Sequence, residues 1–94
     1  MYAVVRRYKT PKLIEIMEQR PADVEAVIRP VPGFVAYYVI KSGDGAATVT
    51  VCQDKAGTDA SIQRAAEWIR QNAPDLAGSP PEVTEGEVIQ QFAR

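Results

Sequence analysis

Four side chains in this sequence are of types that could act on a small molecule: Arg6, Arg7, Tyr37 and Trp68. The two arginines are neighbours in an apolar run, and the alternation of a β-strand sends one side chain to each face of a sheet. A buried arginine needs an anionic partner. That partner is either a carboxylate of this chain, from Glu85 or Glu87, or the oxygen of an anionic or enol-type ligand held in a cavity.

The aromatic residues and the cysteine each admit two interpretations. Tyr37 and Tyr38 are neighbours in a strand-like run, so one belongs to the core and the other could line a cavity. Trp68 lies three residues after Ala65 on an apolar helical stripe, where it either packs against the sheet or walls a pocket. Cys52 is a further candidate for ligand contact, but no basic neighbour in the sequence activates its thiol. Ordinary core packing is the simpler interpretation for each of them.

The composition excludes several kinds of site. The chain has no histidine and one cysteine, so it cannot build a structural zinc site or a histidine-dependent catalytic triad. The acidic residues lack the spacing of a calcium-binding loop. The glycine-rich segment 43–45 lacks the nucleotide-binding fingerprints and is a turn. We therefore expect no metal site and no cofactor.

Charge and cysteine content restrict the partners and the location. A net charge of −1 gives no general attraction to nucleic acid or to an anionic membrane. Residues 48–52, in the third predicted strand, carry no aromatic side chain on which RNA bases could stack. No apolar run is long enough to span a bilayer, and residues 1–7 lack the apolar core of a signal peptide. The unpaired Cys52 fits a reducing compartment, so we expect a cytoplasmic protein with no nucleic-acid or membrane partner.

Apolar patterning predicts one α+β domain over residues 1–94, in the order strand, helix, strand, strand, helix, strand. The two runs that flank Gly43-Asp44-Gly45 are β-branched and aromatic, which is typical of a β-hairpin. The remaining predicted elements are strands at about 2–8 and 82–92, a helix from Pro11 to Pro30 broken at 18–21, and a helix at about 59–73 capped by Thr58 or Asp59.

The hairpin register predicts two uncharged sheet faces. One face carries Phe34, Ala36, Tyr38, Ile40, Ala47, Val49 and Val51, and the other carries Val35, Tyr37, Val39, Thr48, Thr50 and Cys52. A small sheet with one wet face would show charge at alternate positions. One helix layer covers only one face, so we expect a second copy of the chain to cover the other and form a homodimer.

The charges at the two ends of the chain agree with a ferredoxin-like sheet of strand order 4-1-3-2. The basic residues Arg6, Arg7 and Lys9 end the first strand, and Glu82, Glu85 and Glu87 begin the last. In that order the two strands are antiparallel neighbours. The basic end of one strand then lies beside the acidic end of the other, which stabilises cross-strand pairs.

Three motifs give the chain a resemblance to a known family. They are Pro32-Gly33-Phe34 with Tyr37-Tyr38, then Ser61-x-x-x-Ala65-Ala66-Glu67-Trp68, and finally Pro80-Pro81-Glu82-Val83-x-x-Gly86-Glu87-Val88. With them the chain resembles the antibiotic biosynthesis monooxygenase-like domains of the dimeric α/β-barrel superfamily. The match runs in order over nearly the whole chain.

The resemblance implies a ferredoxin-like βαββαβ subunit that packs sheet to sheet in a dimeric α/β barrel. Some relatives oxygenate phenolic or polyketide-derived substrates without metal or flavin, with the help of tryptophan, asparagine and tyrosine side chains. Trp68 falls in a comparable helix, and Asn72 one turn later becomes a candidate for substrate contact. Haem-degrading relatives use a histidine ligand that this chain lacks. The resemblance therefore implies a cofactor-independent monooxygenase-like protein for a small aromatic or enol-type ligand. The alternative is a non-catalytic dimeric binding or accessory domain.

Overall fold

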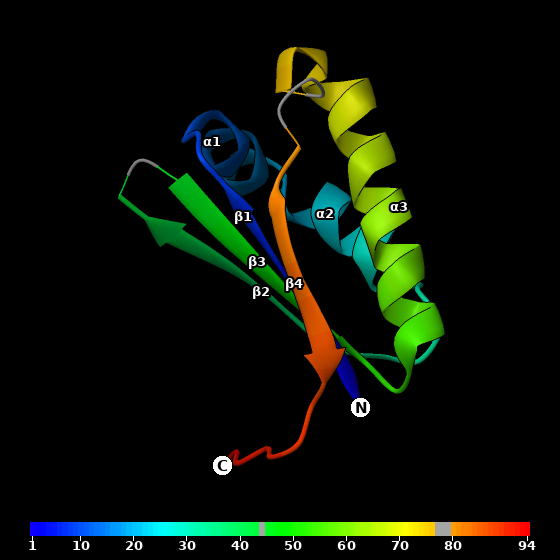
Figure 1. Cartoon of the computed structure of the whole chain (residues 1–94). Helices are drawn as coiled ribbons and strands as arrows, with labels where there is room; N and C mark the ends of the chain where they lie inside the picture. The colour runs from blue at the N-terminus through cyan, green and yellow to red at the C-terminus, as the bar shows by residue number, and fades with distance from the viewer. Residues whose placement is uncertain (44, 77–79) are drawn as a thin grey trace.

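Four antiparallel strands and one layer of helices make up the structure, a computed structural model that describes residues 1–43, 45–76 and 80–94. The elements in chain order are β1 (Tyr2–Tyr8), α1 (Lys12–Gln19), α2 (Pro21–Ile28), β2 (Phe34–Ser42), β3 (Gly45–Cys52), α3 (Lys55–Asn72), the 3-10 helix η1 (Pro74–Leu76) and β4 (Glu82–Glu87). The sheet order β2-β3-β1-β4 confirms the predicted ferredoxin-like α+β fold. The three α-helices lie on the same side of the sheet (Figure 1).

The predicted break in the first helical region is confirmed and divides it into α1 and α2. Arg20 ends α1 and precedes α2 with φ −132° and ψ 53°, outside the helical region. Pro21 is the first residue of α2. The N–H of a first helical residue has no partner within the helix, so proline, which lacks that N–H, is tolerated there. The chain therefore turns a corner at Arg20, and α1 and α2 cover different parts of the sheet.

Helix α3 begins earlier than the sequence predicted, at Lys55 rather than near Asp59. Thr58 and Asp59 lie inside its first turns, where the Thr58 hydroxyl donates to the Lys55 carbonyl at 3.1 Å and Lys55 Nζ contacts Asp59 at 3.0 Å. The sequence did not indicate this earlier start, because Gly57 lies in the first turn and glycine disfavours a helix. A Cβ at position 57 would lie against the Pro32 carbonyl oxygen, so tertiary contact requires glycine here.

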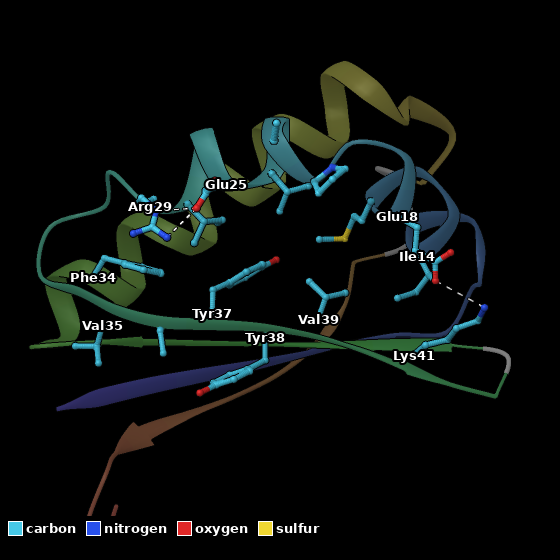
Figure 2. A pocket seen from close by; sticks show the side chains of 16 residues that line it. Ile14, Glu18, Glu25, Arg29, Phe34, Val35, Tyr37, Tyr38, Val39 and Lys41 are labelled. Carbon is cyan, nitrogen blue, oxygen red and sulfur yellow. Dashed lines mark hydrogen bonds and ion pairs between the residues drawn. The ribbon is translucent and has the colours of Figure 1, made fainter. Parts of the chain in front are cut away.

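A β-bulge in β2 reverses part of the predicted face assignment. The ladder with β3 shifts between Phe34 and Ala36, so Phe34 pairs with Cys52 while Ala36 pairs with Val51. Phe34 and Tyr37 consequently point toward the helices, and Val35 points away from them (Figure 2). The prediction was wrong for Phe34 and Val35, because strict alternation cannot anticipate an extra residue in one strand.

From Tyr37 onward the predicted faces of the hairpin are confirmed. Ser42 pairs with Gly45, and Gly43 has a φ of +54° that favours glycine. Asp44 lies outside the described residues. The helix-facing side of the sheet is buried, and its buried residues are Val4, Arg6, Tyr8, Ala46, Thr48, Thr50 and Cys52. The other face, which no helix covers, carries Tyr38 and Ile40 of β2 and Ala47, Val49 and Val51 of β3.

Strand β4 ends at Glu87, five residues before the predicted end at Phe92. Glu87 already lies opposite Tyr2, the first residue of β1, and the N–H of Val88 donates to the carbonyl of Met1 at 2.9 Å. Strand β1 therefore offers no further partner. Residues 89–94 extend away from the sheet and helices (Figure 1), and Ile89 and Phe92 are each 89% exposed.

Candidate functional site

A small cavity between the sheet and the helices brings three of the four predicted catalytic side chains together. Arg6, Tyr37 and Trp68 all line it, together with Tyr8, Leu13, Met17, Val24, Val27, Ile28, Thr48, Ala65 and Ile69. Its volume is about 20 Å³, which is room for about one water molecule. We call this space the inner cavity.

Among the described residues, Arg6 is the only charged one that lines the inner cavity, and it is 2% exposed. Its Nε donates to Thr48 Oγ1 at 3.1 Å, and its Nη1 donates to the Ser61 carbonyl at 3.1 Å. Within residues 1–43, 45–76 and 80–94, its Nη2 has no hydrogen-bond partner. A buried guanidinium with a free donor is a strong site for an anionic oxygen.

The predicted alternative for Arg6, an ion pair with Glu85 or Glu87, is not formed. Glu85 instead lies 3.6 Å from Lys55, and Glu87 is opposite Tyr2 at the far end of the β1–β4 ladder. Among the described parts of the chain, no carboxylate forms a salt bridge with Arg6. Within the described part of the chain, the hydrogen bonds of the buried guanidinium therefore go to two neutral oxygens, Thr48 Oγ1 and the Ser61 carbonyl.

Two tyrosine hydroxyl groups lie close to Arg6. Burial raises the pKa of Tyr37, and the nearby Arg6 cation only partly opposes that shift. Tyr8 behaves alike, because burial raises its pKa and Arg6 lowers it by less. Both tyrosines therefore stay protonated at neutral pH and are available as neutral hydrogen-bond donors beside the guanidinium.

A much larger groove lies outside the inner cavity, between β2 and the helices α1 and α2. Its volume is about 850 Å³. Figure 2 shows Tyr37 reaching across it from β2 toward the helices. We call this space the outer groove. Four residues line both spaces, which therefore adjoin: Met17, Val24, Ile28 and Tyr37.

The charged residues of the outer groove pair with each other. Lys41 lies 3.7 Å from Glu18, and Arg29 lies 2.7 Å from Glu25 (Figure 2). Arg29 also sits 5.8 Å from the centre of the Phe34 ring. The rest of the lining is mainly apolar, so the groove accepts an uncharged, apolar body rather than an ionic one.

Arg7 and Tyr38 do not reach the inner cavity. Arg7 is exposed and lies opposite Glu82 in the β1–β4 ladder, as the predicted meeting of basic and acidic strand ends requires. Tyr38 touches the edge of the outer groove, but its side chain points to the opposite face of the sheet and is 60% exposed. Both residues belong to the face that no helix covers.

Cys52 and Asn72 also lie away from the inner cavity. Cys52 is fully buried beside Gly57, and burial first, then the Asp54 carboxylate, raises the pKa of its thiol. Asn72 accepts a 2.7 Å hydrogen bond from Arg20 Nη1 and donates one of 2.9 Å to the Trp68 carbonyl. Asn72 thus connects the corner between α1 and α2 to the backbone of the cavity residue Trp68.

Sequence reasoning missed Thr48 and Ser61 as partners of Arg6. Strand alternation could have placed Thr48 on the face of Arg6, because the two are directly opposite in the β1–β3 ladder. Ser61 gives no such signal, since its contribution is a backbone carbonyl whose position depends on how closely α3 approaches β1.

Neither a metal-binding cluster nor a membrane-spanning helix occurs among the described residues. No group of three or more histidine, cysteine, aspartate or glutamate residues in residues 1–43, 45–76 and 80–94 could hold a metal ion. None of the helices in those same segments is long and apolar enough to cross a membrane.

Comparisons with known proteins identify relatives of the fold. No protein-family model and no curated protein matches the chain. A protein of unknown function from Nitrosomonas europaea is 22% identical with a TM-score of 0.74, and 99% of this chain covers 93% of it. The ActVA-Orf6 monooxygenase of Streptomyces coelicolor, solved with nanaomycin D, is 17% identical with a TM-score of 0.72, over 99% and 91% of the two chains. SnoaB, a cofactor-independent oxygenase from Streptomyces nogalater, is 16% identical with a TM-score of 0.59, over 99% and 97%.

These likenesses confirm that the chain shares the fold of the antibiotic biosynthesis monooxygenase-like domains that the sequence motifs resemble. At identities of 22% or less, they carry no substrate and no residue role across to this chain.

Proposed function

We propose that this protein is a cofactor-independent, monooxygenase-like enzyme for a phenolic or polyketide-like small molecule. The observation that carries the proposal is the inner cavity, which Arg6, Tyr37 and Trp68 line together and in which Arg6 Nη2 has no hydrogen-bond partner among the described residues. The fold likeness to two oxygenases, one of them described as cofactor-independent, supports it. A cytoplasmic location fits the single, unpaired Cys52.

The chemistry would use the substrate as its own reductant. Arg6 stabilises the phenolate or enolate form, and that electron-rich anion gives one electron to dioxygen. The resulting superoxide and substrate radical combine at a ring carbon. Loss of water from the peroxide leaves a quinone carbonyl: one oxygen atom stays in the product, and the other leaves with the phenol hydrogen and the ring hydrogen. The protein supplies positive charge, hydrogen-bond donors and exclusion of bulk water.

Trp68 and Tyr37 have separate roles in this proposal. The indole N–H of Trp68 is a donor for a substrate oxygen, and the Tyr37 hydroxyl is a neutral donor beside Arg6. The inner cavity holds a single oxygen atom rather than an aromatic ring, because its volume is about 20 Å³. The ring system therefore belongs in the outer groove, which is large and mainly apolar.

The working unit would be a homodimer closed through the uncovered sheet face. That face presents Val5 of β1, Val49 and Val51 of β3, and Tyr38 and Ile40 of β2, without a helix over them. Contiguous exposed apolar patches commonly mark association sites. An obligate interface of this type buries about 2,000 Å² or more in total.

The alternative is a non-catalytic dimeric binding or accessory domain. The small volume of the inner cavity favours this alternative, since no ring fits into it as it stands. Oxygen consumption separates the two: the enzyme consumes dioxygen with a substrate, and the accessory domain does not.

The test measures dioxygen uptake with a panel of phenols, hydroquinones and anthrones after exhaustive chelation, on protein without flavin or haem absorbance. We expect uptake with the most electron-rich members, and a large loss of rate in a folded Trp68→Phe variant, which keeps most of the ring volume but removes the N–H donor. An unchanged rate in that variant would show that Trp68 only packs in the core and has no role in the reaction. No uptake with any member would leave the accessory domain as the function.

A further inference from the structure

Helix α2 is the least buried wall of the inner cavity. It contributes Val24, Val27 and Ile28 to the lining, yet Ile28 is its only buried residue. Segments with little buried apolar surface open locally at a lower free energy than the whole fold. Both of its ends are short connections, at Arg20 and at residues 29–33. This wall can therefore move without unfolding the sheet.

One hydrogen bond fastens the corner of this wall to helix α3. Arg20, which lies between α1 and α2, donates from Nη1 to Asn72 Oδ1 at 2.7 Å. Asn72 in turn donates to the carbonyl of Trp68 at 2.9 Å. Arg20 and Asn72 are 52 positions apart in sequence, so their hydrogen bond joins two segments that are distant along the chain. We call this hydrogen bond the latch.

The residues that the two spaces share come mainly from the same helices. Met17 comes from α1, Val24 and Ile28 come from α2, and only Tyr37 comes from the sheet. A ligand in the outer groove would therefore lie against α1 and α2, next to the inner cavity that Arg6 lines. That cavity has a volume of about 20 Å³, room for about one water molecule, so a bound ligand oxygen needs it to widen, and outward movement of α2 would widen it.

We propose that a ligand reaches Arg6 from the outer groove by outward movement of α2, and that the Arg20–Asn72 latch sets how often this route opens. The inference rests on the proposed function, since it requires a ligand whose anionic oxygen binds Arg6. The mainly apolar lining of the groove, whose charged side chains are paired, favours an apolar body, and Arg6 favours one acidic oxygen on it. Arg20 and Asn72 are positioning residues and do not touch the ligand.

The experiment follows binding of 2-hydroxy-1,4-naphthoquinone, an acidic enol that is an anion at neutral pH, by quenching of Trp68 fluorescence in a stopped-flow instrument. Trp68 is the single tryptophan of the chain and lines the inner cavity. The neutral 2-methoxy ether has nearly the same shape and is the ligand control. Arg6→Met should weaken binding of the anion at least 10-fold and hardly affect the ether.

The latch variants are Arg20→Ala and Asn72→Ala. Each should raise the association and dissociation rate constants together by about 2- to 10-fold, the population change expected from one hydrogen bond, and leave Kd unchanged. The double variant should be no faster than either single variant, because both changes remove the same bond. Arg20→Lys, which keeps a donor, should restore much of the wild-type rate. Lys12→Ala breaks another exposed pair, with Asp75 at 3.2 Å, and should change nothing.

The outcomes separate the two proposals. If the anion binds in an Arg6-dependent way but the latch variants keep wild-type rate constants, the entry route is wrong and the proposed function stands. A changed Kd with unchanged rates of entry would also overturn the route, because it would mean that the latch shapes the bound site. If wild-type protein binds neither probe, the proposed function fails for this ligand class and the entry route fails with it.

Discussion

Arg6 and Arg7 are adjacent in β1, yet they lie in opposite environments. Arg6 is 2% exposed on the helix side, where it contacts Thr48 and Ser61. Arg7 is exposed on the other face and lies opposite Glu82. In the strand ladder a carboxylate residue thus lies opposite the exposed arginine, and neutral Thr48 lies opposite the buried one. Among the described residues, Nη2 of the buried guanidinium has no hydrogen-bond partner.

Matched substitutions of the two arginines should give opposite results. Arg6→Met should weaken binding of an anionic ligand by about 10- to 150-fold, equivalent to a charged hydrogen bond of about 1.5–3 kcal/mol. Its melting temperature should change little, because removal of an unpaired buried charge offsets the two lost hydrogen bonds. Arg7→Met should leave binding intact and cost at most about 1 kcal/mol of stability. Titration calorimetry measures ligand binding and thermal unfolding measures stability for each variant. Equal effects of the two substitutions on binding would show that Arg6 does not bind the ligand.

The buried tyrosines predict a loss of stability in alkali. Burial raises the pKa of Tyr8 and of Tyr37 above the ordinary value of 10.0. The unfolded chain therefore loses these protons at lower pH than the folded one. The stabilisation is fully present below pH 10.0 and is lost as the pH rises through the raised, folded-state pKa values.

Tyr37→Phe and Tyr8→Phe should each flatten that alkaline decline, and the double variant should flatten it most. Urea unfolding from about pH 8 to about pH 11 gives the free energy of unfolding at each pH. The comparison is between the slopes of the variants and of the wild type, so other groups that titrate in this range cancel. Identical slopes would mean that both hydroxyl groups ionise as easily in the folded chain as in the unfolded one.

The uncovered sheet face predicts a charge-sensitive dimer. Val49 lies in β3, opposite Val5 of β1 on one side and Tyr38 of β2 on the other. Val49→Glu would place a carboxylate without a partner in the interface, which should convert the dimer to a monomer. Gln63→Glu adds the same charge at an exposed position of α3 and should leave the dimer intact. Light scattering at micromolar concentration measures both; a monomeric wild type would contradict the proposed assembly.

Gly57→Ala in α3 should destabilise the protein, although replacing glycine by alanine within a helix usually stabilises it. A Cβ there would lie against the Pro32 carbonyl oxygen and 2.9 Å from the Cys52 sulfur. Gly57→Ala gains about 1 kcal/mol of helix propensity, but overpacking costs about 1–3 kcal/mol, so we expect net destabilisation of about 1 kcal/mol. Gly86→Ala is the control, because a Cβ there meets no atom within 4 Å. Denaturant unfolding measures the free energy of unfolding of both variants. A more stable Gly57→Ala variant would show that the backbone at Pro32 moves to make room for the added Cβ.

The sequence alone determined the element order, the strand pairing and most of the sheet faces. Those features follow from local periods: alternation places Tyr37 and Tyr38 on opposite faces, and Pro21 breaks the first helical region at Arg20. The resemblance in three motifs indicated the fold that the structural relatives share. Arg6, Tyr37 and Trp68 could be nominated because their residue types are costly or unusual inside an apolar core.

Only the tertiary structure decided what surrounds those residues. Which arginine is buried depends on the side of the sheet that the helices cover, and both sides of the hairpin are uncharged in the sequence. The bulge that turns Phe34 inward, the Ser61 carbonyl beside Arg6 and the Arg20–Asn72 bond all join segments that are distant in sequence. A local pattern cannot report such contacts, because they are set by how closely helices and sheet approach when the whole chain packs.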